Sequence, residues 1–273
     1  MLKVLRIVTI VLFVVAVGLF AVFYVHEKKT TDMTYPEIKI EEEMLEVSIS
    51  ATEEDFLKGV TAYDAKDGDI TENVVVESVS QFLEDGVCKV TYAVCDNDKH
   101  VVKNSRHIKY IDYTPPKFTM NRSLVFSVDE DVDIIGSIGA VDSIDGDISD
   151  KVVLTATDYS TDTLGVFTVT LQATNSMGDI VYLDLPLHIE QSTIASPVVE
   201  LKEYLIYVKK GETPDFNNNI SSVSSYNGQV TEYESVVRTN FDSNTPGVYS
   251  VHYYVTNPLG YESHSILTVV VEE

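Results

Sequence analysis

The sequence has little of several residue types that mark particular classes of protein. It holds no tryptophan, and only 2 cysteines, 13 glycines and 8 prolines among 273 residues. So few glycines and prolines exclude a collagen-like or low-complexity chain. Tryptophan is the strongest of the aromatic platforms that stack on sugars. Its absence makes carbohydrate binding less expected, although 16 tyrosines remain.

The two cysteines lie seven residues apart in one alternating run, as Cys88 and Cys95. On a single strand this spacing separates the thiols by roughly 23 Å, far beyond disulfide reach. The odd spacing also places them on opposite faces, so we expect Cys88 to fill a core and Cys95 to lie at the strand end. We therefore expect no disulfide between them.

Basic residues are also scarce, with 19 lysines and arginines against 43 acidic residues and a formal net charge of −24. A surface this acidic repels nucleic acid and anionic lipid headgroups, so we predict no nucleic-acid partner. It would attract a cationic partner, or it is only a solvated surface without one.

One long apolar run is present near the N-terminus. Residues 7–25 carry no charge, and a helix of 19 residues spans roughly 28 Å, close to the thickness of the hydrocarbon core. Lys3 and Arg6 precede the run, which predicts a cytoplasmic N-terminus. The alternative is a cleaved signal peptide, but the small-x-small segment at 16–18 lies inside the run. We therefore predict an uncleaved transmembrane signal anchor.

The rest of the chain repeats one pattern. The frame Ala-x-Asp-x-x-Asp-Gly-Asp-Ile-(Ser/Thr)-x-x-Val occurs at 62–74 and again at 140–152. A third copy keeps only a trace of it at 227–231. A glycine, an alternating strand and an Asn or Asp turn then follow in each copy. Each copy opens on a proline, at Pro36, Pro116 and Pro197.

This organisation predicts an all-β fold of three tandem immunoglobulin-like β-sandwich domains after one N-terminal transmembrane helix. The proline-led junctions predict short, stiff links and a rod of separate beads. The predicted segments are a cytoplasmic N-terminus (1–6), the transmembrane signal anchor (7–25), a linker (26–35), and Ig-like domains at 36–115, 116–195 and 196–273, the last degenerate and rich in tyrosine.

The aspartate frame, the Gly-x-aromatic-x-Val strand and the closing run Asp112-Tyr113-Thr114-Pro115-Pro116 carry a family resemblance. Together they resemble the bacterial immunoglobulin-like repeats found on an insecticidal crystal toxin and on many cell-surface proteins. The resemblance covers roughly residues 36–273, closely for the first two copies and loosely for the third. It implies a spacer or adhesion module on a bacterial surface, and it implies no activity.

The aspartates of the frame are the candidate metal ligands. Hard cations take several carboxylate and carbonyl oxygens, so one interpretation is a calcium site, with help from Asp96 or Asn175. The other is turn chemistry, in which Asp-Gly forms a tight turn and the flanking carboxylates accept backbone N–H groups. Calcium is the only cofactor that the sequence suggests. The residues concerned are Asp64, Asp67, Asp69, Asp142, Asp145 and Asp147.

No catalytic motif accompanies these aspartates. The six histidines show no His-Glu-x-x-His spacing, and the sequence has no Gly-x-Ser-x-Gly elbow, phosphate loop or dinucleotide fingerprint. We expect structural or exposed histidines and no enzyme activity.

Tyrosines gather in the third copy, either as core residues or as a binding surface. The candidate partner-binding residues are Tyr226, Tyr233 and Tyr261. The predicted function is a membrane-anchored, non-catalytic adhesion or interaction rod whose C-terminal domain binds a protein or a cell-wall glycan. The alternative is an envelope scaffold or assembly factor for a membrane or cell-wall partner, and an enzyme is the remaining alternative.

Overall fold

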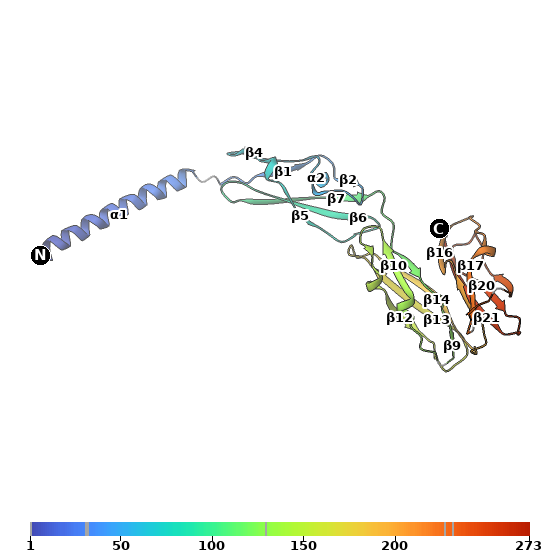
Figure 1. Ribbon diagram of the computed structural model, residues 1–273. Helices are drawn as coiled ribbons and strands as arrows, with labels where there is room; N and C mark the ends of the chain where they lie inside the picture. The colour runs from blue at the N-terminus through green and yellow to red at the C-terminus, as the bar shows by residue number, and fades with distance from the viewer. Residues whose placement is uncertain (1, 31–32, 129, 227, 231) are drawn as a thin grey trace. The chain divides into compact units, whose positions relative to one another are not determined.

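The computed structural model describes residues 2–30, 33–128, 130–226, 228–230 and 232–273. The chain divides into two units, Met1–Ile111 and Asp112–Glu273. The first unit holds the helix α1 and one β-sandwich, and the second unit holds two β-sandwiches (Figure 1). The prediction of an all-β fold after one N-terminal helix is confirmed.

Helix α1 spans Leu2–Thr30. Its segment Arg6–Glu27 has a mean hydropathy of 2.9 over its most apolar window, and that window has no buried residue. Apolar side chains without any protein cover are expected of a helix that lies in lipid, although a signal sequence has the same character. Among the described residues this is the one helix long and apolar enough to cross a membrane.

All three sandwiches have the same sheet plan, in which a three-stranded sheet packs on a four-stranded one. In the first sandwich the sheet orders are β1-β3-β4 and β2-β7-β6-β5. Its elements are β1 (Glu37–Ile40), β2 (Met44–Val47), α2 (Glu53–Phe56), β3 (Val60–Asp64), β4 (Gly68–Asp69), the 3₁₀ helix η1 (Thr71–Asn73), β5 (Val75–Val79), β6 (Val87–Cys95) and β7 (Val101–Tyr110).

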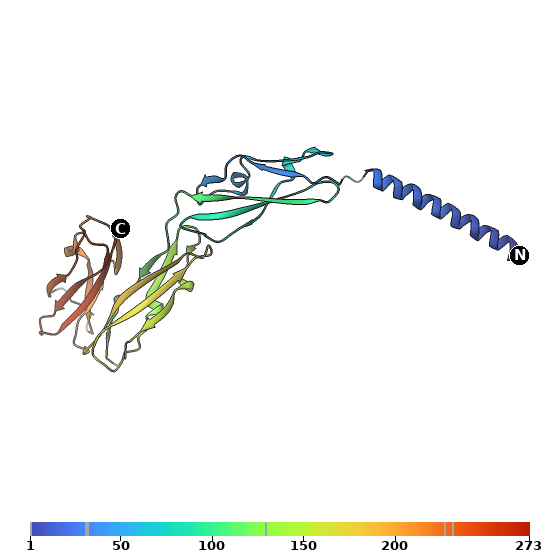
Figure 2. The same ribbon diagram turned by 180° about the vertical axis from the view of Figure 1, so that it is seen from behind.

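The second sandwich repeats this plan with the orders β11-β10-β8 and β12-β13-β14-β9, and its long β13–β14 hairpin is the yellow pair of strands in Figure 2. Its elements are β8 (Lys117–Met120), β9 (Val125–Ser127), η2 (Ile135–Ser137), β10 (Ile138–Asp142), β11 (Gly146–Asp147), η3 (Ser149–Lys151), β12 (Val153–Thr157), β13 (Gly165–Thr174) and β14 (Ile180–Glu190).

The third sandwich has the orders β15-β17-β18 and β16-β21-β20-β19. Its elements are β15 (Val198–Leu201), β16 (Leu205–Lys209), η4 (Phe216–Asn218), β17 (Ile220–Ser225), β18 (Gly228–Gln229), β19 (Glu234–Thr239), β20 (Gly247–Thr256) and β21 (Glu262–Glu272). Neighbouring strands are antiparallel except for β2 with β7, β9 with β14, and β16 with β21, which pair in parallel.

Alternation along the central strands explains the cores. In β6, Cys88, Val90, Tyr92 and Val94 are buried, whereas Cys95 at the strand end is exposed. The predicted places of both cysteines are therefore confirmed, and both thiols are free. Burial raises the pKa of the Cys88 thiol to about 11, which makes it an inert core residue.

The second and third sandwiches do not behave as separate beads. Leu205 and Val270 of the third sandwich pack against the hydrophobic core of the second. The Tyr207 hydroxyl accepts a hydrogen bond from the Phe118 N–H at 2.9 Å, and the Ser123 hydroxyl accepts one from the Ile266 N–H at 2.9 Å. The expectation of separate beads is wrong for this pair, because apolar side chains exposed on one sandwich are buried by the other.

Candidate functional site

The aspartate frame of the second sandwich builds a closed turn. Asp142 is buried at the end of β10, and its Oδ1 accepts hydrogen bonds from the N–H groups of Ile144 and Asp145 at 2.9 Å each. Gly146 then takes a φ of +73°, a conformation that favours glycine. Asp147 Oδ1 accepts from the Ser149 N–H at 3.0 Å. Asp142, Gly146 and Asp147 thus each have a local role in turn geometry.

Carboxylates of the same frame also form hydrogen bonds with a second loop of the sandwich. Asp145 accepts hydrogen bonds from the N–H and the hydroxyl of Ser176, both at 2.6 Å, and lies 3.3 Å from the Lys151 ammonium. Asp142 Oδ2 accepts from the Asn175 amide at 3.1 Å. Burial would raise the pKa of Asp145, but the hydrogen bonds from Ser176 and Lys151 outweigh it and hold this pKa below its usual range. These two carboxylates therefore join the β10–β11 loop to the β13–β14 turn by hydrogen bonds. We call the bonds of Asp142 to Asn175 and of Asp145 to Ser176 the loop–turn link.

The first sandwich has the same turn. Asp64 Oδ1 accepts from the N–H groups of Lys66 and Asp67, at 2.8 and 2.9 Å. Asp67 in turn accepts from the N–H and the side-chain amide of Asn97, at 2.9 Å each. Asp69 Oδ1 accepts from the Thr71 N–H at 3.0 Å, as Asp147 does from Ser149.

The two copies differ at the residue that begins the second turn of each sandwich. Asp96 of the first sandwich stands where the second has Asn175, and it accepts from the His100 N–H and contacts His100 Nδ1, both at 2.7 Å. Buried Asp64 Oδ2 has no hydrogen-bond partner among the described residues. The first copy thus keeps the turn and the hydrogen bonds from Asn97 to Asp67. It lacks an amide that donates to Asp64 Oδ2.

The calcium hypothesis stays a prediction. Within the described part of the chain, which includes all six aspartates, no three of them bring carboxylate oxygens within 4.8 Å of one another. The hydrogen bonds and ion pairs described for these aspartates come from backbone N–H, hydroxyl, amide and ammonium donors. Turn chemistry, the alternative interpretation of the frame, accounts for these contacts without an ion.

The third sandwich has an open, apolar hollow at the place where the first two sandwiches have the loop–turn link. The hollow measures about 370 Å³ and is lined by Ile194, Ala195, Ser225, Tyr226, Val230, Asn257, Pro258 and Leu259. Tyr226 and Leu259 are 80% and 79% exposed. Buried Asn257 holds the wall in place, since its amide donates to the Ala195 carbonyl at 2.9 Å and its Oδ1 accepts from the Leu259 N–H at 3.0 Å. Two hydrogen bonds of one buried side chain thus join the Leu259 turn to the segment that holds Ala195.

The three tyrosines predicted to bind a partner do not all meet in this hollow. Tyr226 lines it, and Tyr261 belongs to the adjoining turn, where its N–H donates to Asn257 Oδ1 at 3.0 Å. Tyr233 is not among the lining residues. Leu259 and Ile194 were not predicted, because single exposed apolar residues in loops give no periodic signal.

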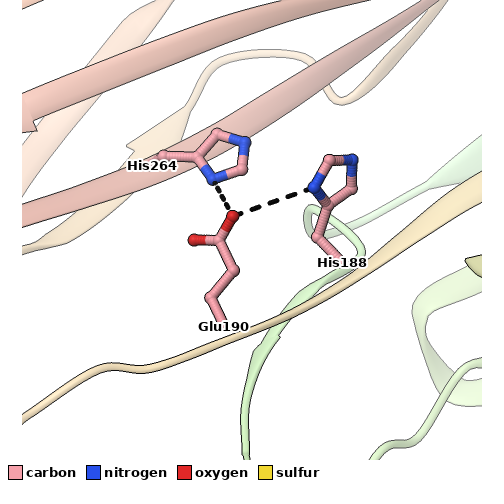
Figure 3. Close-up of side chains that lie close together, drawn as sticks. All are labelled: His188, Glu190 and His264. Carbon is pink, nitrogen blue, oxygen red and sulfur yellow. Dashed lines mark ion pairs between the residues drawn. The ribbon is translucent and has the colours of Figure 1, made fainter. Parts of the chain in front are cut away.

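A third cluster joins the second sandwich to the third. His188 and Glu190 project from β14 toward His264 of β21, as Figure 3 shows. Glu190 Oε1 lies 2.8 Å from His264 Nδ1 and 3.8 Å from His188 Nδ1. Behind them, His252 Nδ1 of β20 lies 3.1 Å from His264 Nε2. The spacing of His188 and Glu190, two residues apart, signals a shared strand face, but no sequence spacing signals His264 beside them.

The electrostatics of this cluster are strongly coupled. Burial would raise the pKa of Glu190, but the neighbouring His188 and His264 outweigh it and lower that pKa to about 2. Burial, reinforced by the other two histidines, lowers the pKa of His252 to about 4. At neutral pH the cluster therefore combines an ionised carboxylate with an uncharged His252.

No protein-family model matches the chain. It is similar to an uncharacterized 81.3 kDa protein of Acholeplasma phage L2, with 28% identity over 145 residues that cover 52% of this chain and 19% of that protein. It is also similar to the pesticidal crystal protein Cry22Aa of Bacillus thuringiensis, with 27% identity over 139 residues that cover 50% and 18%. The chain therefore spans about one fifth of the length of these relatives.

Two solved structures show distant likeness. The Drosophila N-cadherin EC1-3 fragment has 13% identity and a TM-score of 0.31, covering 88% of this chain and 90% of that one. The CBM51-2 and INT domains of Clostridium perfringens ZmpB, solved in complex with GlcNAc, have 15% identity and a TM-score of 0.24, covering 87% and 42%. Likeness at this level carries no argument about function.

Proposed function

We propose that the chain is a membrane-anchored bacterial surface protein whose sandwiches are immunoglobulin-like repeats and act as a non-catalytic interaction module. In this proposal α1 anchors the protein with its N-terminus in the cytoplasm, and the acidic sandwiches lie outside the cell. The unburied apolar side chains of Arg6–Glu27 support the anchor. The similarity to a crystal protein supports the repeat family.

The hollow of the third sandwich is the observation that carries the proposal. Contiguous exposed apolar side chains on a soluble domain mark interaction sites, and tyrosine is enriched in protein interfaces. Asn257 pre-organises this surface, which lowers the entropic cost of binding. Most of the lining side chains are apolar, and few can hydrogen-bond sugar hydroxyls. A protein partner with an apolar side chain that enters the hollow fits this surface better than a glycan.

Site-specific photocrosslinking in intact cells tests the partner. A photoreactive residue at Leu259 is expected to form a protein adduct, and Tyr226→Ala is expected to weaken it roughly tenfold or more, as for an interface hot spot. A photoreactive residue at Tyr63, an exposed tyrosine of the first sandwich, is the matched control and should give no such adduct. Equal adducts from both positions would contradict the proposal. Sedimentation with purified cell wall that depends on Tyr226 would replace the protein partner by a glycan.

Membrane anchoring has its own test. The full chain should stay with the membrane during alkaline extraction, and protease added to intact cells should digest the sandwiches. Removal of residues 1–30 should release the sandwiches into the soluble fraction. Sandwiches protected from external protease would overturn the predicted orientation.

A further inference from the structure

Outside the hollow, the cluster of His188, Glu190 and His264 brings together the side chains best suited to hold an ion. Its three ligand atoms lie within 4.8 Å of one another, and this is the one such group of three among the described residues. We propose that these three side chains bind a divalent transition-metal ion, of which zinc is the best fit. The ion would connect β14 of the second sandwich to β21 of the third.

The distances suit such an ion. Zinc bonds of about 2.1 Å in tetrahedral geometry hold neighbouring ligand atoms about 3.4 Å apart. The two separations from Glu190 Oε1, 2.8 Å to His264 Nδ1 and 3.8 Å to His188 Nδ1, lie on either side of that value. A shift of about half an ångström, within the freedom of side-chain rotation, would equalise them.

The buried end of the cluster brings two ligand atoms together. His264 is buried, and its Nδ1 lies 2.8 Å from Glu190 Oε1 without completing a hydrogen bond. A metal ion between these two atoms would satisfy both of them. The Nδ1 lone pair of His264 is therefore the central donor of the site.

His252 supplies the support that a metal-binding histidine needs. Its Nδ1 lies 3.1 Å from His264 Nε2, and two ring nitrogens bond only when one donates and the other accepts. With the proton on His264 Nε2, the opposite nitrogen of that ring presents its lone pair to the ion. Metal-binding histidines commonly donate their other N–H in this way, which fixes the tautomer and the ring orientation.

The ion also has a route to the site. Glu190 and His264 line a polar cleft of about 430 Å³, and the Glu190 side chain is partly exposed. Water from this cleft would fill the fourth position of a tetrahedral ion. Two imidazoles and one carboxylate favour zinc and its neighbours over calcium or magnesium, which prefer six or more oxygens.

Zinc titration of the full chain in detergent, after removal of metals by EDTA, tests the proposal. Calorimetry with zinc chloride should show one ion per chain. At a free zinc concentration near 100 times Kd, Tm should rise by about 5–10 °C for a unit of this size. Glu190→Gln and His188→Gln retain the size of their side chains and should each abolish this rise. His107→Ala removes an exposed histidine of β7 and should leave it unchanged.

Two results would overturn the site. One is the absence of zinc binding by the wild type, and the other is an unchanged ion count and Tm rise in both glutamine variants. Where a variant does not fold, as judged by circular dichroism, cobalt(II) absorption of the wild type decides. A spectrum like that of hydrated cobalt would refute coordination by the protein, and the intense bands of a four-coordinate ion would support it.

Discussion

The second and third sandwiches share a sheet plan and differ at one end. In the second, Asp142 pairs with Gly146 across the hairpin, and in the third Ser225 pairs with Gly228, with one residue fewer between them. Pro258 stands in the turn where the second sandwich has Ser176, and proline has no N–H to donate. Pro258 therefore removes one donor of the loop–turn link, and the apolar hollow lies at this place. The difference teaches that an exposed apolar surface can arise where a hydrogen-bond donor of the turn is replaced by proline.

The largest loss of stability is expected when the hydrogen bonds of Asp142 are removed from the second sandwich. Asp142→Ala removes an acceptor of three hydrogen bonds and should cost about 3 kcal/mol, because bonds to a charged acceptor are worth more than neutral ones. Ser225→Ala at the open end changes an exposed hydroxyl that donates to the Gly228 carbonyl at 3.4 Å, and it should cost less, about 0.5 kcal/mol. Hydrogen-exchange protection of β13 and of β20 measures the two sandwiches separately. A loss of β13 protection in Asp142→Ala that is no larger than the loss of β20 protection in Ser225→Ala would show that the hydrogen bonds of Asp142 contribute little stability.

A smaller loss of stability should follow from replacing Asn175, which donates to Asp142, by the aspartate that the first sandwich has at this position. Asn175→Asp places a second carboxylate against Asp142 and removes the amide donor, which should cost about 2 kcal/mol at pH 7. Hydrogen exchange of β13 reads this loss. It should shrink as the pH falls, since one of two facing carboxylates then takes up a proton.

The reverse exchange in the first sandwich, Asp96→Asn, should have the opposite sign. The new amide can donate to the unsatisfied Asp64 Oδ2, as Asn175 does to Asp142. Loss of the contact with His100 limits the gain. Protection of β6 should therefore rise or stay level, and a fall as large as that of Asn175→Asp would contradict the comparison.

Much of this architecture was predictable because the information is local. Strand alternation gave the sandwiches and the buried place of Cys88. The Asp-Gly-Asp frame suggested turn chemistry, since its hydrogen bonds join residues two or three positions apart. The partner of Asp145, Ser176, lies 31 residues away, and only the repeat of both landmarks in each copy hinted at it.

The rest depends on contacts that no pattern along the chain encodes. His264 meets Glu190 only because the third sandwich packs on the second, and proline-led junctions predicted the opposite arrangement. Tyr226 and Tyr233 looked alike in sequence, yet one lines the hollow and the other does not. Side chains in loops take their places from tertiary contacts rather than from periodicity.

The stability that Asp145 contributes through the loop–turn link should depend on pH. The pKa of Asp145 is lowered in the folded state, so its stabilisation is present above the ordinary value of 3.8 and is lost as the pH falls below it. Asp145→Asn should cost about 1 kcal/mol at pH 7, because an amide oxygen is a weaker acceptor than a carboxylate. The cost should shrink toward pH 3. Unfolding of both proteins at the two pH values checks this, and a cost that grows in acid would refute the assignment.

The smallest effect is expected where the first two sandwiches differ only at the surface. Lys66 lies 2.6 Å from Asp98, whereas the corresponding residue of the second sandwich is Ile144. Lys66→Ile leaves the backbone N–H that donates to Asp64 in place, so the turn should persist. An exposed ion pair contributes about 0–1 kcal/mol and is screened by salt. Tm should therefore fall slightly at low salt and match the wild type at 1 M salt, and a loss that persists at 1 M would mean that Lys66 packs rather than pairs.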